Sequence, residues 1–266
     1  MRDQLGLGEP FAERLVDFAV KAVTFDFGRS VYTQRPVLDD IADAAPETAT
    51  LAGISLVIAT ILGLAAGIAA AVRRGRLIDR GVSALSAVGS AVPPFIIGYL
   101  LIIPFAIHRS TLPATGFAEI GEDGIVEWIR HLILPCTALA VPLAAEIARQ
   151  TRSSLVETLE QDYIRTLRAA GLGRGPVVLR HGLRNAALPI VTVIGLQLGR
   201  LLGGTVVVER IFNIPGFGTL IYTAVLNRDL PVIQGVVMVS AVLVLVANVL
   251  VDASHVLLNP RLRHAH

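Results

Sequence analysis

Three long stretches of this chain carry no charged residue, and they constrain the fold more than any other feature. They are residues 48–72, 81–107 and 230–251. Each exceeds the roughly 18–20 apolar residues that a helix needs to cross the hydrocarbon core of a bilayer. Charged residues make up only 17% of the whole chain, against about 25% in an ordinary soluble domain. The sequence therefore predicts an all-α, polytopic membrane protein built as a helical bundle.

Two further stretches are weaker candidates for membrane spans. Residues 131–145 form a short uncharged run, and residues 185–208 are long enough but contain Arg200. One arginine at the centre of a span costs roughly 2.5–3.5 kcal/mol on insertion scales, whereas each Leu, Ile or Val returns about 0.3–0.6 kcal/mol. Because the second stretch is rich in these three residue types, we expect it to insert. The sequence thus predicts about five transmembrane helices.

Arginine is concentrated between and after these spans. The arginine-rich segments are residues 73–80, 146–184 and 259–266. If the spans alternate in direction, all three fall on one side of the membrane, which the positive-inside rule assigns to the cytosol. Residues 1–47 are then an external segment, residues 48–258 a transmembrane domain that includes the cytosolic loop 146–184, and residues 259–266 a cytosolic tail. The external segment shows no signal peptide, so we expect a further transmembrane helix to precede it in the complete protein.

Residues 160–189 form a charged segment between two apolar spans. They read EQDYIRTLRAAGLGRGPVVLRHGLRNAALP and include five arginines. We expect two short amphipathic helices joined by a turn, in a position to contact a cytosolic partner. Gly171 is suited to end the first helix, because glycine tolerates the left-handed cap conformation. Pro176 is suited to open the second helix, where its missing N–H costs nothing.

Small residues and prolines inside the spans predict a closely packed bundle with broken helices. Gly63 and Gly67 have the spacing that lets a second helix approach closely, although glycine is also common in membrane helices generally. Pro93 and Pro94 must interrupt the backbone hydrogen bonds of the second span. Such breaks are common in transporters, and they also occur as structural kinks without a mechanism.

The span 185–208 combines a face of glycines with two polar residues. The residues that we expect to line a polar pathway are Gln197, Arg200 and Gly203. Arg200 has two other interpretations, because it can also reach a lipid headgroup or pair with an acid on a partner. The sequence leaves these alternatives open.

The sequence lacks the motifs of common catalytic and cofactor sites. It has no Gly-x-x-x-x-Gly-Lys-Ser/Thr phosphate loop, and the GLGRG run lacks the lysine and the preceding strand of such a loop. No His-Glu-x-x-His helix or Cys/His spacing predicts zinc, and the single Cys136 excludes an internal disulfide. We therefore expect no enzyme activity, no cofactor or metal bound by this chain, and no nucleic-acid partner.

Residues 162–196, DYIRTLRAAGLGRGPVVLRHGLRNAALPIVTVIGL, resemble the cytoplasmic loop of the permease subunits of bacterial ATP-binding-cassette (ABC) importers. The dipeptide and oligopeptide branch is the better match, because the spacing from Gly171 to Pro189 has that branch's longer form. FDFGRS (25–30), LPATGF (112–117) and GGTVVVERIFNIPGFG (203–218) are similar to other segments of the family. Arg200 departs from the family pattern, in which an apolar residue is usual.

The resemblance implies a type I ABC importer transmembrane fold in the cell (inner) membrane, with a family core of six helices whose first helix this chain lacks. It also implies a second homologous permease subunit, an external substrate-binding protein, and two ABC ATPase subunits that use ATP and Mg. The residues expected to couple to the ATPase are Asp162, Tyr163, Arg165, Thr166, Arg168, Ala169, Ala170, Gly171 and Leu172. The residues expected at an external gate or binding-protein contact are Asn213, Pro215, Gly216 and Gly218.

The resemblance favours di- and oligopeptides as substrates, with nickel or glutathione-like peptides as alternatives. Two other functional classes stay open. An ATP-independent secondary carrier would show inverted repeats and ionisable residues within the membrane, and neither is clear here. A membrane anchor would need neither broken, glycine-rich spans nor a structured cytosolic hairpin.

Overall fold

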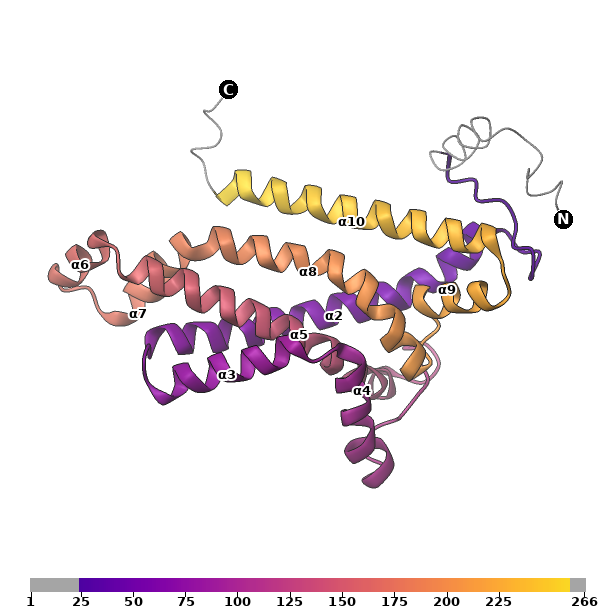
Figure 1. Cartoon of the computed structure of the whole chain (residues 1–266), viewed down its shortest axis with the longest axis horizontal. Coiled ribbons are helices and arrows are strands. Elements are labelled where there is room, and N and C mark those ends of the chain that lie inside the picture. Colours follow the sequence, from indigo (N-terminus) through magenta and orange to yellow (C-terminus); the bar gives the residue numbers. More distant parts are fainter. Residues whose placement is uncertain (1–23, 259–266) are drawn as a thin grey trace.

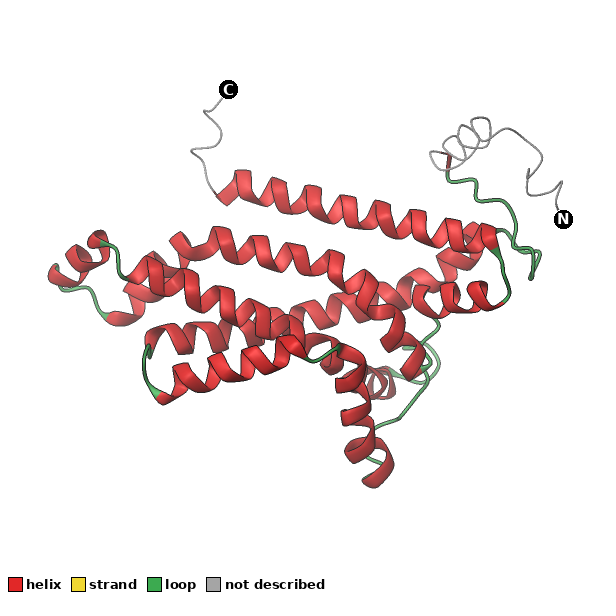
Figure 2. Cartoon of the chain, in the orientation of Figure 1, coloured by secondary structure: helices red, strands yellow, loops and turns green. Residues whose placement is uncertain are grey.

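All regular secondary structure in the described part of the chain is helical (Figure 2). The computed structural model describes residues 24–258. The helices are α2 (Val37–Val72), α3 (Leu77–Ala91), α4 (Pro94–Ile102), the π-helical η1 (Ile103–His108), α5 (Ile125–Leu159), α6 (Asp162–Ala169), α7 (Arg174–Pro176), the π-helical η2 (Val177–Gly182), α8 (Leu183–Phe212), α9 (Phe217–Leu226) and α10 (Leu230–Leu258). The predicted all-α class is confirmed. Residues 1–23 of the predicted external segment and the predicted tail, residues 259–266, lie outside the described residues.

The described helices supply the predicted number of membrane spans. Four stretches are long and apolar enough to cross a bilayer: α2, α5, the stretch Arg174–Leu201 that runs from α7 into α8, and the stretch Leu230–Val251 of α10. A fifth is present if α3 and the helix after it count as one broken span. The two halves of that span meet at an angle of 100°, and Figure 1 shows α4 turned away from the rest of the bundle. Pro94 cannot donate a backbone hydrogen bond to α3. The predicted break at Pro93 and Pro94 is therefore confirmed.

Two helices extend beyond their apolar runs. α2 begins at Val37, so part of the predicted external segment is helical. α5 continues to Leu159, so residues 146–159 of the predicted cytosolic loop also belong to a helix. In that extension Ile147 and Leu155 are fully buried, while Arg149 on another side is exposed. Burial of one face stabilises the helix beyond the point where charged residues end the apolar run.

α5 is the centre of the bundle, since it packs against α2, α3, α4 and α8. Its contact with α2 depends on the two glycines expected to allow close approach. A Cβ atom at Gly63 would lie 2.7 Å from the Cβ of Ile147. One at Gly67 would lie 2.6 Å from the Cβ of Thr151 and 2.7 Å from the Ala148 carbonyl oxygen. The predicted close helix approach is confirmed, and its partner is α5.

We expect Gly67→Val to destabilise the subunit, because the new side chain must push the backbone of α5 away from α2. Overpacking of this kind costs roughly 1–3 kcal/mol. The measurement is thermal unfolding of the purified protein in detergent, compared with Gly53→Val. Gly53 lies on the same helix, and a Cβ there would meet no atom within 4 Å. Equal shifts in the two variants would show that helix propensity, rather than the α2–α5 contact, accounts for the loss.

Two arginine-rich segments lie at the same end of the bundle. The end that carries α6 also carries the turn between α2 and α3 (Figure 1), and we call it the α6 end. Arg152 of α5 binds Asp79 of α3 through two hydrogen bonds there, and the Nη2–Oδ2 distance is 2.9 Å. Arg74 pairs with Glu160 and links the α2–α3 turn to the segment before α6. The alternating direction of the spans predicts that these two arginine-rich loops lie on one side of the membrane. In the structure they do lie together.

The opposite end, which we call the α9 end, carries the described part of the predicted external segment. Asp229, only 2% exposed, precedes α10. Its carboxylate accepts hydrogen bonds from the Ser30 hydroxyl at 2.5 Å and from the Val31 and Tyr32 N–H groups at 3.2 Å. These bonds hold the segment before α2 against the turn between α9 and α10.

Candidate functional site

The charged segment 160–189 forms a helix, a turn and the start of a second helix. α6 ends at Ala169, and Gly171 follows with φ of 85°, a left-handed conformation that favours glycine. The Gly171 N–H donates to the Arg168 carbonyl at 3.0 Å, and the Leu172 N–H donates to the Leu167 carbonyl at 3.2 Å. This pair of bonds is the Schellman motif. The predicted glycine cap is confirmed.

The second helix of this segment is continuous with a membrane span. It starts at Arg174, contains Pro176 in its first turn and runs through η2 into α8. Proline is tolerated in a first turn because its N–H would have no helical partner there. η2 is π-helical, a local widening that is frequent at functional positions. The turn after α6 is therefore joined through one helix to the middle of the bundle.

α6 is held against the start of that helix. Ile164 is fully buried, and Val177 and Val178 of η2, which packs beside α6, are buried as well. The Asn185 amide of α8 donates a hydrogen bond to the Tyr163 hydroxyl at 2.6 Å. α6 thus has a fixed position relative to α8.

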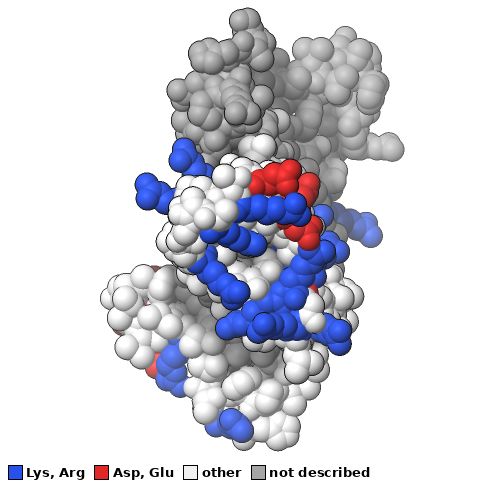
Figure 3. All heavy atoms as spheres, turned by 90° about the vertical axis from the view of Figure 1, so that its left-hand side faces the viewer, with Lys and Arg blue, Asp and Glu red and all other residues white. Residues whose placement is uncertain are grey.

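The remaining residues predicted for ATPase coupling form an exposed surface at the tip of the molecule (Figure 1). Tyr163 is half-buried, and the exposed ones are Asp162, Arg165, Thr166, Arg168, Ala169, Ala170, Gly171 and Leu172. Figure 3 looks onto this end and shows arginine side chains gathered over it, with a few acids among them. The Arg165 guanidinium pairs with Asp162 one turn earlier at 3.2 Å. The positive charge of this surface is complementary to acidic groups.

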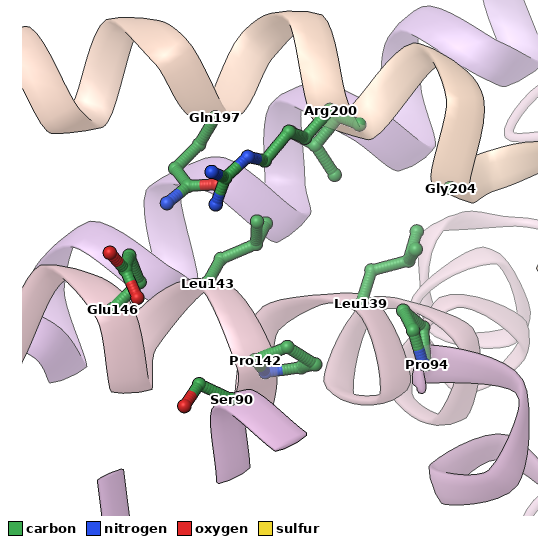
Figure 4. Close-up of a pocket in the computed structure, with 10 residues that line it drawn as sticks. Ser90, Pro94, Leu139, Pro142, Leu143, Glu146, Gln197, Arg200 and Gly204 are labelled. Carbon is green, nitrogen blue, oxygen red and sulfur yellow. The ribbon is translucent and has the colours of Figure 1, made fainter. Parts of the chain in front are cut away.

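A cavity of about 180 Å³ lies between α5 and α8, beside the break between α3 and α4 (Figure 4). Its lining residues are Ser90, Pro94, Leu139, Pro142, Leu143, Glu146, Gln197, Arg200, Leu201 and Gly204. Of the residues expected on a pathway, Gln197 and Arg200 line this cavity. Gly203 does not: it is exposed, a Cβ there would meet no atom within 4 Å, and its neighbour Gly204 takes the place on the cavity wall.

A buried carboxylate organises the α9 end. Glu209 is fully buried, and its side chain accepts hydrogen bonds from the Thr48 hydroxyl at 2.9 Å and the Gly218 N–H at 2.6 Å. The Thr48 oxygen in turn accepts from the Phe217 N–H at 2.8 Å. Three helices, α2, α8 and α9, therefore meet at one carboxylate.

The four residues predicted for an external gate or binding-protein contact lie in the turn between α8 and α9 and in the first turn of α9. Asn213 ends α8 in a left-handed conformation with φ of 52°, and Pro215 follows it, both exposed. Gly216 and Gly218 are buried. A Cβ at either one would lie within 3 Å of the Glu209 carboxylate. Only the first two residues are accessible to a partner in this conformation.

Sequence reasoning did not find three of the polar residues that organise these sites. Glu209 belongs to the family-like segment 203–218, but the sequence predicted no role for this glutamate. Thr48 is the first residue of an uncharged stretch, and no role was predicted for it either. Glu146 is the first residue of the predicted cytosolic loop, although it lines the cavity. A charged residue bordering an apolar run was the available signal, but nothing in a single sequence shows which distant residue faces it. Within residues 24–258, no group of three or more His, Cys, Asp or Glu side chains is arranged to hold a metal ion.

Comparison with known proteins agrees with this architecture. A chain of the inward-facing MetNI methionine ABC transporter superposes with a TM-score of 0.70 at 21% identity, over 85% of this chain and 99% of that chain. A crystal structure of an amino acid ABC transporter with histidines gives a TM-score of 0.60 at 14% identity, over 82% of this chain and 94% of that chain. These likenesses show the type I ABC importer transmembrane fold.

Two further relatives are more similar to this chain in sequence than these structures are. A probable peptide ABC transporter permease, y4tP, of Sinorhizobium fredii (strain NBRC 101917 / NGR234) is 40% identical over 99% of this chain and 84% of its own length. The glutathione transport system permease protein GsiC of Escherichia coli (strain K12) is 42% identical over 99% of this chain and 83% of its own length. The family described as binding-protein-dependent transport system inner membrane component matches residues 63–264. The chain belongs to this family and is a multi-pass permease subunit of an ABC importer.

Proposed function

We propose that this permease subunit couples through α6 to a cytosolic ABC ATPase and that the assembled importer transports di- and oligopeptides. The observation that carries the proposal is the placement of α6 at the tip of the molecule, exposed and joined through a capped turn to the helix that becomes α8. ATP and Mg bind to the partner ATPase in this proposal, and this chain itself catalyses no reaction.

Three properties of α6 support the coupling role. Most of its docking residues, from Asp162 to Leu172, are exposed. Its position is fixed by buried Ile164 and by the hydrogen bond between Tyr163 and Asn185. Its turn leads without interruption into α8, which lines the central cavity. Closure of two ATPase subunits on ATP would then rock α8 and its neighbours between inward-facing and outward-facing arrangements.

The proposed assembly contains two ATPase subunits, a second homologous permease subunit and an external substrate-binding protein. The α6 end faces the cytosol together with the C-terminus, and the α9 end with the N-terminal segment faces outward. Asn213 and Pro215 are the proposed contacts of the binding protein, because they are exposed at the α9 end. Gly216 and Gly218 belong to the proposed external gate, where they allow α9 to lie against Glu209.

Peptides are the proposed substrates because they are the chemical class that the two relatives share. One relative is named for peptides and the other for glutathione, which is itself a tripeptide. The binding protein would make the first selection among peptides, and the permease would then accept what is delivered.

Two experiments test this function, a copurification and then a transport assay. We expect the tagged chain, purified from membranes that express the whole importer, to bring down an ABC ATPase and a second permease. In proteoliposomes with the binding protein present, a labelled dipeptide should enter only when ATP is supplied on the ATPase side. Uptake without ATP would favour a secondary carrier, and recovery without any ATPase would favour a membrane anchor. Either result would overturn the proposal.

A further inference from the structure

The cavity between α5 and α8 has matched walls. Leu139, Pro142, Leu143 and Glu146 of α5 have the spacing of one helix face, and Gln197, Arg200, Leu201 and Gly204 of α8 repeat the same spacing. The two stripes lie on opposite walls of the cavity. The cavity is also partly open to the surface of the subunit, so a ligand longer than the cavity can extend out of it.

Polar groups of both charges gather at one end of this cavity. In Figure 4 the guanidinium group of Arg200 extends alongside the Gln197 amide, and Glu146 lies across from Gln197 on α5. These three residues occupy the side nearer α6, since α5 runs toward α6 and α8 runs away from it. Apart from Ser90, the rest of the lining is apolar and includes Leu139, Pro94 and Gly204 (Figure 4).

One residue at this polar end, Gln197, is unusual for the interior of a membrane protein. Gln197 is only 1% exposed, and its Oε1 atom has no hydrogen-bond partner. A buried amide oxygen without a partner costs about 1–3 kcal/mol, so the fold retains a group that a ligand N–H would satisfy. Glu146 pairs through one oxygen with Arg149 at 2.5 Å, and its other oxygen is in no described ion pair. Ionisable residues within a membrane protein mark functional sites by default.

We propose that this cavity binds the zwitterionic backbone of the transported peptide during its passage. Arg200 takes a carboxylate of the substrate, Gln197 accepts a hydrogen bond from a peptide N–H, and Glu146 takes an ammonium group. A peptide with both free termini brings one charge of each sign. Arg200 is the positive partner that the cavity wall offers, and Glu146, which also pairs with Arg149, is the negative one. The proposal rests on the proposed import of peptides and assigns to that function its recognition residues in the membrane.

The test uses the complete importer in proteoliposomes, with a labelled dipeptide and its C-terminally amidated form. Both peptides are delivered by the binding protein at saturating concentrations, and their affinity for the binding protein is measured separately. We expect Arg200→Ala to lower uptake of the free dipeptide about tenfold or more, the usual effect of losing a hydrogen bond to a charged group. Uptake of the amidated peptide should fall much less in this variant, since that peptide has no carboxylate for Arg200 to bind. Arg200→Lys should recover part of the loss.

Two further variants complete the test. Glu146→Gln should lower uptake of the free dipeptide but not of an N-acetylated one. Leu196→Ala is the matched control, because Leu196 lies on α8 outside the cavity and its side chain is 53% exposed.

The outcomes distinguish failure of the proposed import function from failure of the proposed peptide site. If the unaltered importer shows no ATP-dependent uptake, the proposed function itself fails. If it transports and Arg200→Ala leaves uptake unchanged, or lowers uptake of both peptides equally, the peptide site is refuted. In the second case Arg200 has a structural role or contacts a lipid headgroup, which a dependence of the variant's uptake on anionic lipid content would reveal.

Discussion

Replacement of Gly171 by valine is expected to abolish peptide uptake while leaving membrane insertion intact. The Gly171 backbone has φ of 85°, where a β-branched residue is strained by roughly 1–3 kcal/mol. A Cβ atom at this position would meet no atom of the subunit within 4 Å. The strain therefore acts on the shape of the turn rather than on the packing of the bundle. A distorted turn moves α6 relative to α8, and the proposed ATPase partner would then dock out of register with the membrane helices.

Gly173→Val is the matched control for this prediction. Gly173 lies in the same exposed turn, but its backbone has φ of -64° and ψ of 159°, a conformation that valine adopts readily. Membrane fractionation measures insertion, and uptake together with ATPase copurification measures coupling. We expect the control to retain most of the uptake. Normal uptake by Gly171→Val would contradict the assignment of α6 as the coupling helix.

The second large effect is expected at the other end of the bundle, where Gly218→Ala should destabilise the fold. The added Cβ would lie 2.3 Å from the Cα and 2.8 Å from the carbonyl oxygen of Val206. Because these are backbone atoms, rotation of a side chain cannot relieve the clash. α9 must shift away from α8, which also lengthens the 2.6 Å hydrogen bond between the Gly218 N–H and Glu209. The clash and the weakened hydrogen bond together should lower the free energy of unfolding by more than the roughly 1–3 kcal/mol typical of overpacking.

Thermal unfolding in detergent measures this loss, and we expect the apparent Tm to fall by roughly 5 °C or more. Gly203→Ala on α8 is the control, because a Cβ there meets no atom within 4 Å. It should leave the Tm nearly unchanged. A Gly218→Ala subunit as stable as the control would show that the packing of α9 on Glu209 is looser than described.

Local properties of the chain were predictable from the sequence for a physical reason. Uncharged runs predict membrane helices because the bilayer demands them at each position independently. The cap at Gly171 and the break at Pro93 and Pro94 follow from backbone sterics of those residues alone. The close approach at Gly63 and Gly67 was predictable as a property of one helix, although its partner was not.

Properties that join distant residues were decided only by the tertiary structure. Thr48 and Glu209 are 161 positions apart, and Asp79 and Arg152 are 73 apart, yet each pair is hydrogen-bonded. The length of α5 beyond its apolar run depends on neighbours that bury one of its faces. The cavity exists because equivalent stripes on α5 and α8 face each other, which neither stripe reveals by itself. The sequence thus determined which segments enter the membrane, because the bilayer acts on each segment separately, whereas the structure decided which side chains meet, because that depends on packing between helices.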